Sequence, residues 1–170
     1  PLTREYLCSN GVECPEIYGD PALLLPYYYS SNRVIKYKLG IIPHYVDRYN
    51  PNLLNLAKES GILLINMRDY VNWRDVIDRI NQCEFIVSSS LHGLIISDAY
   101  NIPNMWVEFS NDIIGGHFKF LDYFKSVNRT TSAPLKINSS VSLTHLLNFK
   151  SEWKPIYFDP KPLIDNCPFR

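Results

Sequence analysis

The chain lacks an excess of charge of either sign, because 17 Lys and Arg residues balance 17 Asp and Glu residues among its 170 positions. A neutral chain does not create the positive field that attracts nucleic acids, so we expect no nucleic-acid partner. Long apolar runs are also missing. No stretch approaches the roughly 20 apolar residues that cross a bilayer, and no signal peptide is visible. The sequence therefore predicts a globular protein without a transmembrane segment.

Cysteine is scarce, and the usual cofactor motifs are missing. The spacing of Cys8, Cys14, Cys83 and Cys167 fits no metal motif, and their low density is typical of reduced thiols in a cytosolic protein. The sequence contains no G-x-G-x-x-G or Walker motif, which argues against NAD and P-loop nucleotides. It also lacks the G-x-S-x-G elbow of many serine hydrolases. We therefore expect neither a metal nor a cofactor.

Apolar runs that favour strands alternate with segments of helical periodicity. This order is typical of βαβ units with right-handed crossovers and predicts a Rossmann-like α/β fold, a three-layer structure around a parallel sheet. A polar, aromatic loop at residues 27–32 marks a boundary before the repeat. Strands are expected at 16–18, 37–42, 62–65, 85–87 and 105–109, and the strand at 62–65 is expected to be buried. Helices are expected at 2–10, 52–60, 73–80, 91–100, 117–125 and 143–149.

Residues 84–93 are the most informative stretch, because an apolar run ends there in three serines, a leucine, a histidine and a glycine. This order predicts a buried strand that turns directly into a helix N-terminus. Such turns bind ligands in open α/β sheets, and helix N-termini favour anions. His92 would lie in the first helical turn beside Ser88, Ser89 and Ser90, where it could bind an anion or relay a proton. The residues alone leave open a purely structural histidine in a serine-rich cap.

Two further residues are expected near this turn. His44 follows the strand at 37–42, so it should project from the same carboxyl edge of the sheet as His92. Lys119 follows two glycines after the strand at 105–109 and could supply positive charge to an anionic ligand. A solvated lysine in an ordinary loop is the alternative for Lys119.

Several segments together resemble the polysaccharide pyruvyl transferase family in their order and spacing over about 125 residues. The resemblance implies a fold like that of the two-domain GT-B glycosyltransferases, with phosphoenolpyruvate as the donor substrate. The product that the resemblance implies is a pyruvate ketal on a sugar of a precursor of a surface polysaccharide, exopolysaccharide or capsule. The segments are Tyr18-Gly-Asp-Pro-Ala-Leu-Leu-Leu-Pro26, Gly40-Ile-Ile-Pro-His-Tyr-Val-Asp47, Ser88-Ser-Ser-Leu-His-Gly-Leu-Ile-Ile-Ser-Asp-Ala-Tyr100 and Lys119-Phe-Leu-Asp-Tyr-Phe124.

On this resemblance, Leu91 and His92 match the family's motif for phosphoenolpyruvate, and His92 contacts the donor or acts as its general acid. Many family members carry an arginine where this chain has Ser90, so another cation such as Lys119 would have to replace it. The donor-binding set expected here is Ser88, Ser89, Ser90, Leu91, Gly93, His44 and Lys119, with His92 as the catalytic residue.

The resemblance also implies the organisation and location of the protein. Residues 1–30 would be the remnant of an N-terminal domain with its linker, and residues 31–170 a Rossmann-like C-terminal domain with an irregular tail. The acceptor would be a saccharide, lipid-linked, and the enzyme cytoplasmic or peripheral to the inner face of the membrane. A chain of this extent is expected to bind the donor weakly and to be inactive when it is alone.

Two other functions stay open from the sequence. A GT-B glycosyltransferase that uses a nucleotide sugar would have a similar half-domain, although Glu108 is the only nearby glutamate for its donor site. A non-catalytic Rossmann-like module that binds an anion or a partner protein is the third alternative. Asp98 and Asp122 are candidates to take the proton from an acceptor hydroxyl. For Asp98 the preferred interpretation is instead a surface or helix-packing residue.

Overall fold

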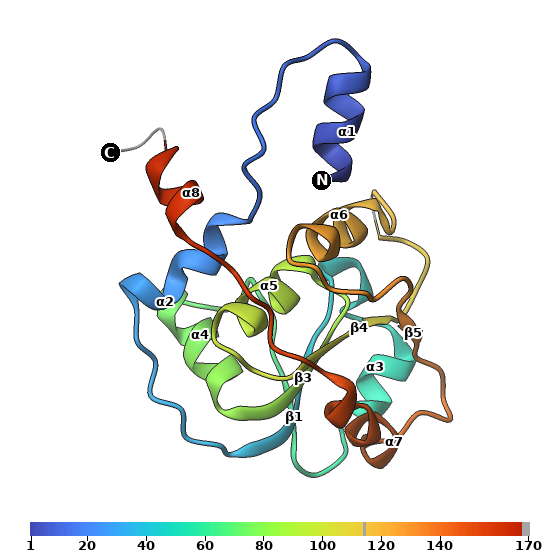
Figure 1. Cartoon of the computed structure of the whole chain (residues 1–170). Coiled ribbons are helices and arrows are strands. Elements are labelled where there is room, and N and C mark those ends of the chain that lie inside the picture. Colours follow the sequence, from blue (N-terminus) through green and yellow to red (C-terminus); the bar gives the residue numbers. More distant parts are fainter. Residues whose placement is uncertain (114, 168–170) are drawn as a thin grey trace.

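The computed structural model describes residues 1–113 and 115–167. It consists of a five-stranded sheet in the order β2-β1-β3-β4-β5, with every neighbouring pair parallel, and helices on both faces (Figure 1). The α/β fold predicted from the alternating pattern, Rossmann-like with three layers, is therefore confirmed. The strands are β1 (Tyr37–Ile42), β2 (Ile62–Leu64), β3 (Cys83–Ser88), β4 (Asn104–Glu108) and β5 (Leu135–Lys136).

The helices lie in an outer layer on each face of the sheet. Helices α3 and α7 pack on one face, and α4, α5 and α6 pack on the other. The α-helices are α1 (Leu2–Ser9), α2 (Leu25–Tyr28), α3 (Pro51–Leu56), α4 (Trp73–Asn81), α5 (Leu91–Ala99), α6 (Phe118–Ser126), α7 (Leu143–Asn148) and α8 (Lys161–Asp165). The 3₁₀ helices are η1 (Pro21–Leu24), η2 (Tyr45–Asp47) and η3 (Phe149–Glu152).

Central position in the sheet explains the near-continuous apolar strands. In β1 and β3, the last four residues of each strand are buried, as expected for strands that are covered by helices on both faces. Strand β2 was predicted to be buried, but it lies at the edge of the sheet and all three of its residues are half-buried. Edge position alone accounts for this difference, because one side of β2 has no neighbouring strand.

Local signals explain where the helices begin. The Asn72 side chain accepts a hydrogen bond from the Arg74 N–H, and the Asp75 carboxylate accepts one from the Asn72 N–H, which completes a capping box at the start of α4. Asp20 accepts from the Ala22 N–H at the start of η1, with Pro21 in the first position. These caps fix the helix entries without help from the core.

The strand predicted at residues 16–18 is wrong. The structure has a bend and extended chain there, which leads from α1 to η1 outside the sheet (Figure 1). A three-residue run forms a strand only where it reaches an open sheet edge, and here Arg4 instead holds the segment by donating to the Cys14 carbonyl at 2.8 Å. Conversely, the two-residue β5 was not predicted, because two residues are too short to show a period.

No helix among residues 1–113 and 115–167 is long and apolar enough to cross a membrane.

Candidate functional site

The carboxyl ends of β1, β3 and β4 lie side by side at one edge of the sheet. Ile42 pairs with Ser88, and Ser88 pairs with Trp106, so these three strands end at nearly the same level. The segments that follow carry His44, the three serines and the start of α5. Open α/β sheets bind their ligands at this edge, and the structure brings most of the predicted residues to it.

The hydroxyls of Ser88 and Ser89 are buried and bonded to protein atoms. Ser88 Oγ lies 2.9 Å from the Ile42 carbonyl and accepts from the Ser90 N–H at 3.0 Å. Ser89 Oγ accepts from the His44 N–H at 2.9 Å. These two serines therefore brace the strand ends, and the half-buried Ser90, whose side chain makes no cap bond to α5, is the serine nearest the surface.

Asp47 joins the segments that follow β1, β3 and β4, and sequence analysis did not select it. Its carboxylate is 1% exposed and accepts from Ser89 Oγ at 3.0 Å and from Ser110 Oγ at 2.5 Å. A buried carboxylate is stable only with such donors. The only available signal was an acidic residue placed five positions after a buried strand, which is too weak to distinguish it from an exposed acid.

The first turn of α5 presents backbone N–H groups at this edge. The N–H groups of Leu91, His92 and Gly93 start the helix, where the first N–H groups have no intrahelical acceptor. Gly93 lets this turn lie against the sheet, since an added Cβ would be 2.4 Å from Ser88 Oγ and 2.9 Å from Ile42 Cγ2. Close packing thus places the N-terminus of α5 directly over the end of β3.

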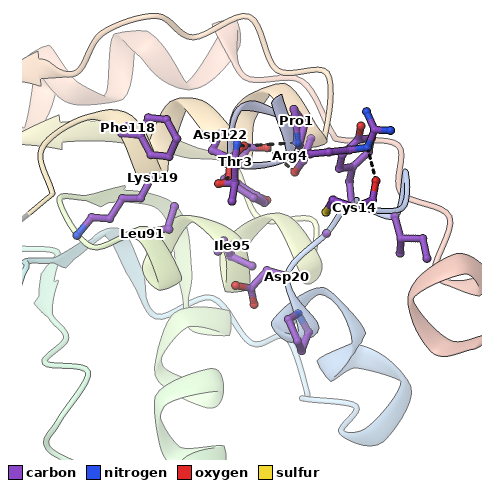
Figure 2. Close-up of a pocket in the computed structure, with 16 residues that line it drawn as sticks. Pro1, Thr3, Arg4, Cys14, Asp20, Leu91, Ile95, Phe118, Lys119 and Asp122 are labelled. Atoms are coloured by element: carbon purple, nitrogen blue, oxygen red, sulfur yellow. Dashed lines mark hydrogen bonds and ion pairs between the residues drawn. The ribbon is translucent and has the colours of Figure 1, made fainter. Parts of the chain in front are cut away.

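The His92 side chain lies beside Asp20, the residue that caps η1. Its Nε2 lies 3.8 Å from Asp20 Oδ2, and its side chain is 61% exposed. A histidine beside a carboxylate can hold and transfer a proton. Asp20 also lines a cavity of about 390 Å³ between α1, α5 and α6, together with Leu91, Ile95, Phe118 and Asp122 (Figure 2). His92 therefore stands beside a space that a small molecule can enter.

Lys119 links this cavity to His44. The Lys119 side chain lines the cavity and extends away from Asp20 and Asp122 (Figure 2). Burial lowers the pKa of His44, and the Lys119 ammonium lowers it further, against an opposing effect of Asp47. The Lys119 charge therefore acts on His44, which is neutral over a wider pH range than an exposed histidine. His44 and Lys119 together offer a neutral imidazole and a cation at the same edge.

A second histidine–carboxylate pair follows β4. His117 Nε2 lies 2.8 Å from Glu108 Oε1, and the Glu108 side chain is 8% exposed whereas that of His117 is 46% exposed. The His117 ring also meets the Trp106 ring edge to face at 4.9 Å. Sequence analysis considered Glu108 only for a nucleotide sugar and did not pair it with His117, because the nine-residue separation gives no periodic signal.

The two acidic residues considered for the acceptor proton have other partners. Asp98 is buried and forms an ion pair with Arg129 at 3.1 Å, so it is a packing residue, as preferred from the sequence. Asp122 lies in the cavity wall, where Thr3 Oγ1 donates to it at 2.5 Å.

Comparison with known proteins identifies the family. The sequence profile described as "Polysaccharide pyruvyl transferase" matches residues 1–111, which include His44, His92 and the complete first turn of α5. The chain belongs to the polysaccharide pyruvyl transferase family.

Two curated proteins are similar to this member of the family. One is "Uncharacterized protein L143" of Acanthamoeba polyphaga mimivirus, 30% identical over 141 residues, which cover 77% of this chain and 48% of the viral protein. The other is "Succinoglycan biosynthesis protein ExoV" of Rhizobium meliloti, 29% identical over 114 residues, which cover 65% of this chain and 34% of that protein. The chain thus spans about half of the first relative and a third of the second. No solved structure gives a significant match.

Proposed function

We propose that the protein transfers the pyruvyl group of phosphoenolpyruvate to a pair of hydroxyls on a sugar of a polysaccharide precursor. The observation that carries this proposal is the family match over residues 1–111, which includes Leu91 and His92 at the start of α5. The similarity to a protein named for succinoglycan biosynthesis supports an exopolysaccharide product. A cytoplasmic reaction on a lipid-linked saccharide, with the enzyme at the inner membrane surface, completes the proposal.

The donor fits the chemistry of the sheet edge. Phosphoenolpyruvate carries a phosphate and a carboxylate, which need N–H donors and a cation. The first N–H groups of α5 supply the donors, and Lys119 supplies the cation that Ser90 does not provide. In this proposal His44 contributes a neutral imidazole, and the braced serines hold the strand ends in position.

His92 is assigned the proton transfer. Ketal formation begins when a proton adds to the methylene carbon of phosphoenolpyruvate and a sugar hydroxyl adds to C2. Phosphate then leaves, and a second hydroxyl closes the ketal. His92 is exposed beside Asp20 at 3.8 Å, and a histidine with a carboxylate partner suits a general acid.

The test incubates the full-length protein with phosphoenolpyruvate and methyl glycosides of galactose and mannose, and measures released phosphate and the mass of the product. We expect the sugar to gain a pyruvate ketal. His92→Ala should lower kcat about 100-fold or more, the usual contribution of a general acid. The matched control is His145→Ala, an exposed histidine of α7 on the opposite face of the sheet, which should keep wild-type turnover.

Two outcomes would reject the proposal. Turnover of a nucleotide sugar without phosphate release from phosphoenolpyruvate would identify a glycosyltransferase. Binding of phosphoenolpyruvate without turnover of either donor would favour a non-catalytic anion-binding module. Equal turnover by His92→Ala and wild type would reject the role of His92 alone.

A further inference from the structure

The Glu108–His117 pair has the geometry of an oriented base. Its 2.8 Å contact uses Nε2 of the imidazole, so a neutral ring donates its Nε2 hydrogen to the carboxylate and keeps a lone pair on Nδ1. Such an arrangement fixes the tautomer and orientation of a histidine that accepts protons. The edge-to-face contact with Trp106 holds the ring from a second side.

The two members of the pair differ in their access to solvent. The Glu108 side chain is almost buried at 8% exposure, whereas the His117 side chain is 46% exposed. Solvent weakens the attraction in a partly exposed ion pair, so this pair contributes little to stability. Here the carboxylate is inside and the imidazole faces outward, so the pair can present a basic nitrogen to a molecule at the surface.

The pair lies at the same edge and on the same face of the sheet as His92. Trp106 of β4 pairs with Ser88 of the adjacent strand β3. Glu108 is two residues further along β4, at the level where the chain that leaves β3 begins α5. Alternate residues of a strand share a face, and Trp106 packs in the same cluster as Leu94 of α5. Glu108 therefore lies at the carboxyl edge of the sheet, on the face that α5 covers, and holds His117 there.

We propose that His117, held by Glu108, is the base that removes the proton from an acceptor hydroxyl; this inference rests on the proposed function. Closing the ketal forms a bond between that hydroxyl oxygen and C2 of the pyruvyl group, after the C2–O bond to phosphate has broken. The proton moves to His117 Nδ1 and then to the departing phosphate. The proton of the other hydroxyl returns to His92 and replaces the one that His92 delivers to the methylene carbon, so every proton in the reaction is accounted for.

The experiment uses the full-length protein with phosphoenolpyruvate and the same methyl glycosides. Donor binding is measured by calorimetry, and turnover by phosphate release. We expect His117→Ala to lower kcat about 100-fold or more, while the Kd for phosphoenolpyruvate stays within twofold of wild type. Added imidazole should restore part of kcat in this variant and leave wild type unchanged. Glu108→Gln keeps a hydrogen-bond acceptor without the charge, so it should lose less activity than His117→Ala.

Further variants and outcomes separate the possible failures. His117→Gln keeps most of the side-chain volume against Trp106, so its melting temperature and kcat show whether lost activity reflects lost folding. His145→Ala is the histidine control. A kcat within twofold of wild type in His117→Ala would overturn the role of the base, and so would loss of donor binding, which would make His117 a donor ligand. Absence of turnover in the wild-type protein would reject the proposed function, and the base with it.

Discussion

At the scale of single residues, His44 is the side chain whose environment departs most from that of an ordinary histidine. Its Nδ1 is buried and has no hydrogen-bond partner among the described residues. Burial lowers the pKa of His44, and the positive charges of Lys119 and Arg68 lower it further, more than Asp47 opposes. The folded protein therefore favours the neutral form of this imidazole at the edge where the proposed donor binds.

This pKa gives the stability a defined pH dependence. Above the usual histidine pKa of about 6.5, both folded and unfolded chains hold His44 neutral, and its contribution is fully present. As the pH falls through this value toward the lower folded pKa, the unfolded chain takes up the proton first, so the free energy of unfolding decreases. We expect His44→Gln to reduce this decrease in urea unfolding experiments between pH 7.5 and 5. The exposed His145→Gln should leave it intact, and an unchanged pH profile in His44→Gln would contradict the prediction.

At the scale of elements, the contact between α5 and the sheet determines the geometry of the site. Gly93 lies against Ser88 and Ile42 so closely that a methyl group would meet Ser88 Oγ at 2.4 Å. Because Ser88 Oγ also bonds the Ile42 carbonyl and the Ser90 N–H, any shift there moves the start of α5. The glycine thus couples packing of the helix to the position of its N-terminal N–H groups.

Gly93→Ala should therefore lower both stability and donor binding. Overpacking of a close-packed contact costs about 1–3 kcal/mol in the free energy of unfolding, which urea denaturation measures. The pair Gly93→Ala and Ser88→Ala should be less destabilising together than the sum of the two single changes, because removing Ser88 Oγ relieves the contact. Additive effects would mean that the helix moves away from β3 as a whole.

The sequence predicted the elements that have a strong period or a cap and missed those that depend on neighbours. The α4 apolar residues Val76, Ile77 and Ile80 follow a helical spacing and are all buried, so local pattern and packing agree. The strand at 16–18 failed because its short apolar run has no sheet edge within reach. His44 and the α5 turn could be placed at one edge because parallel strands share their direction. The bond between Glu108 and His117 could not, since it depends on how the segment after β4 folds back.

At the scale of the whole molecule, a buried polar cluster ties the last third of the chain to the central layers. Asp98, at the end of α5, has a fully buried side chain and forms an ion pair with Arg129 at 3.1 Å. Tyr123 of α6 donates to the same carboxylate at 2.8 Å, and Arg129 also donates to the Asn104 carbonyl of β4 at 2.9 Å. The indole Nε1–H of Trp153, which follows η3, donates to Asp98 Oδ1 at 3.4 Å. The cluster therefore joins α5, α6, β4 and the tail at one point.

Loss of Arg129 should be among the most destabilising changes in this chain. Arg129→Ala leaves the Asp98 carboxylate buried without its counter-ion, which costs about 3–5 kcal/mol, and the midpoint of urea unfolding should fall accordingly. Lys125→Ala is the matched control, because Lys125 and its partner Glu5 are 51% and 58% exposed and an exposed pair contributes only about 0–1 kcal/mol. Combining Arg129→Met with Asp98→Asn removes both charges and should recover part of the loss. Equal stability of the Arg129→Ala and Lys125→Ala variants would show that the tail and α5 are held together by apolar packing rather than by the Arg129–Asp98 ion pair.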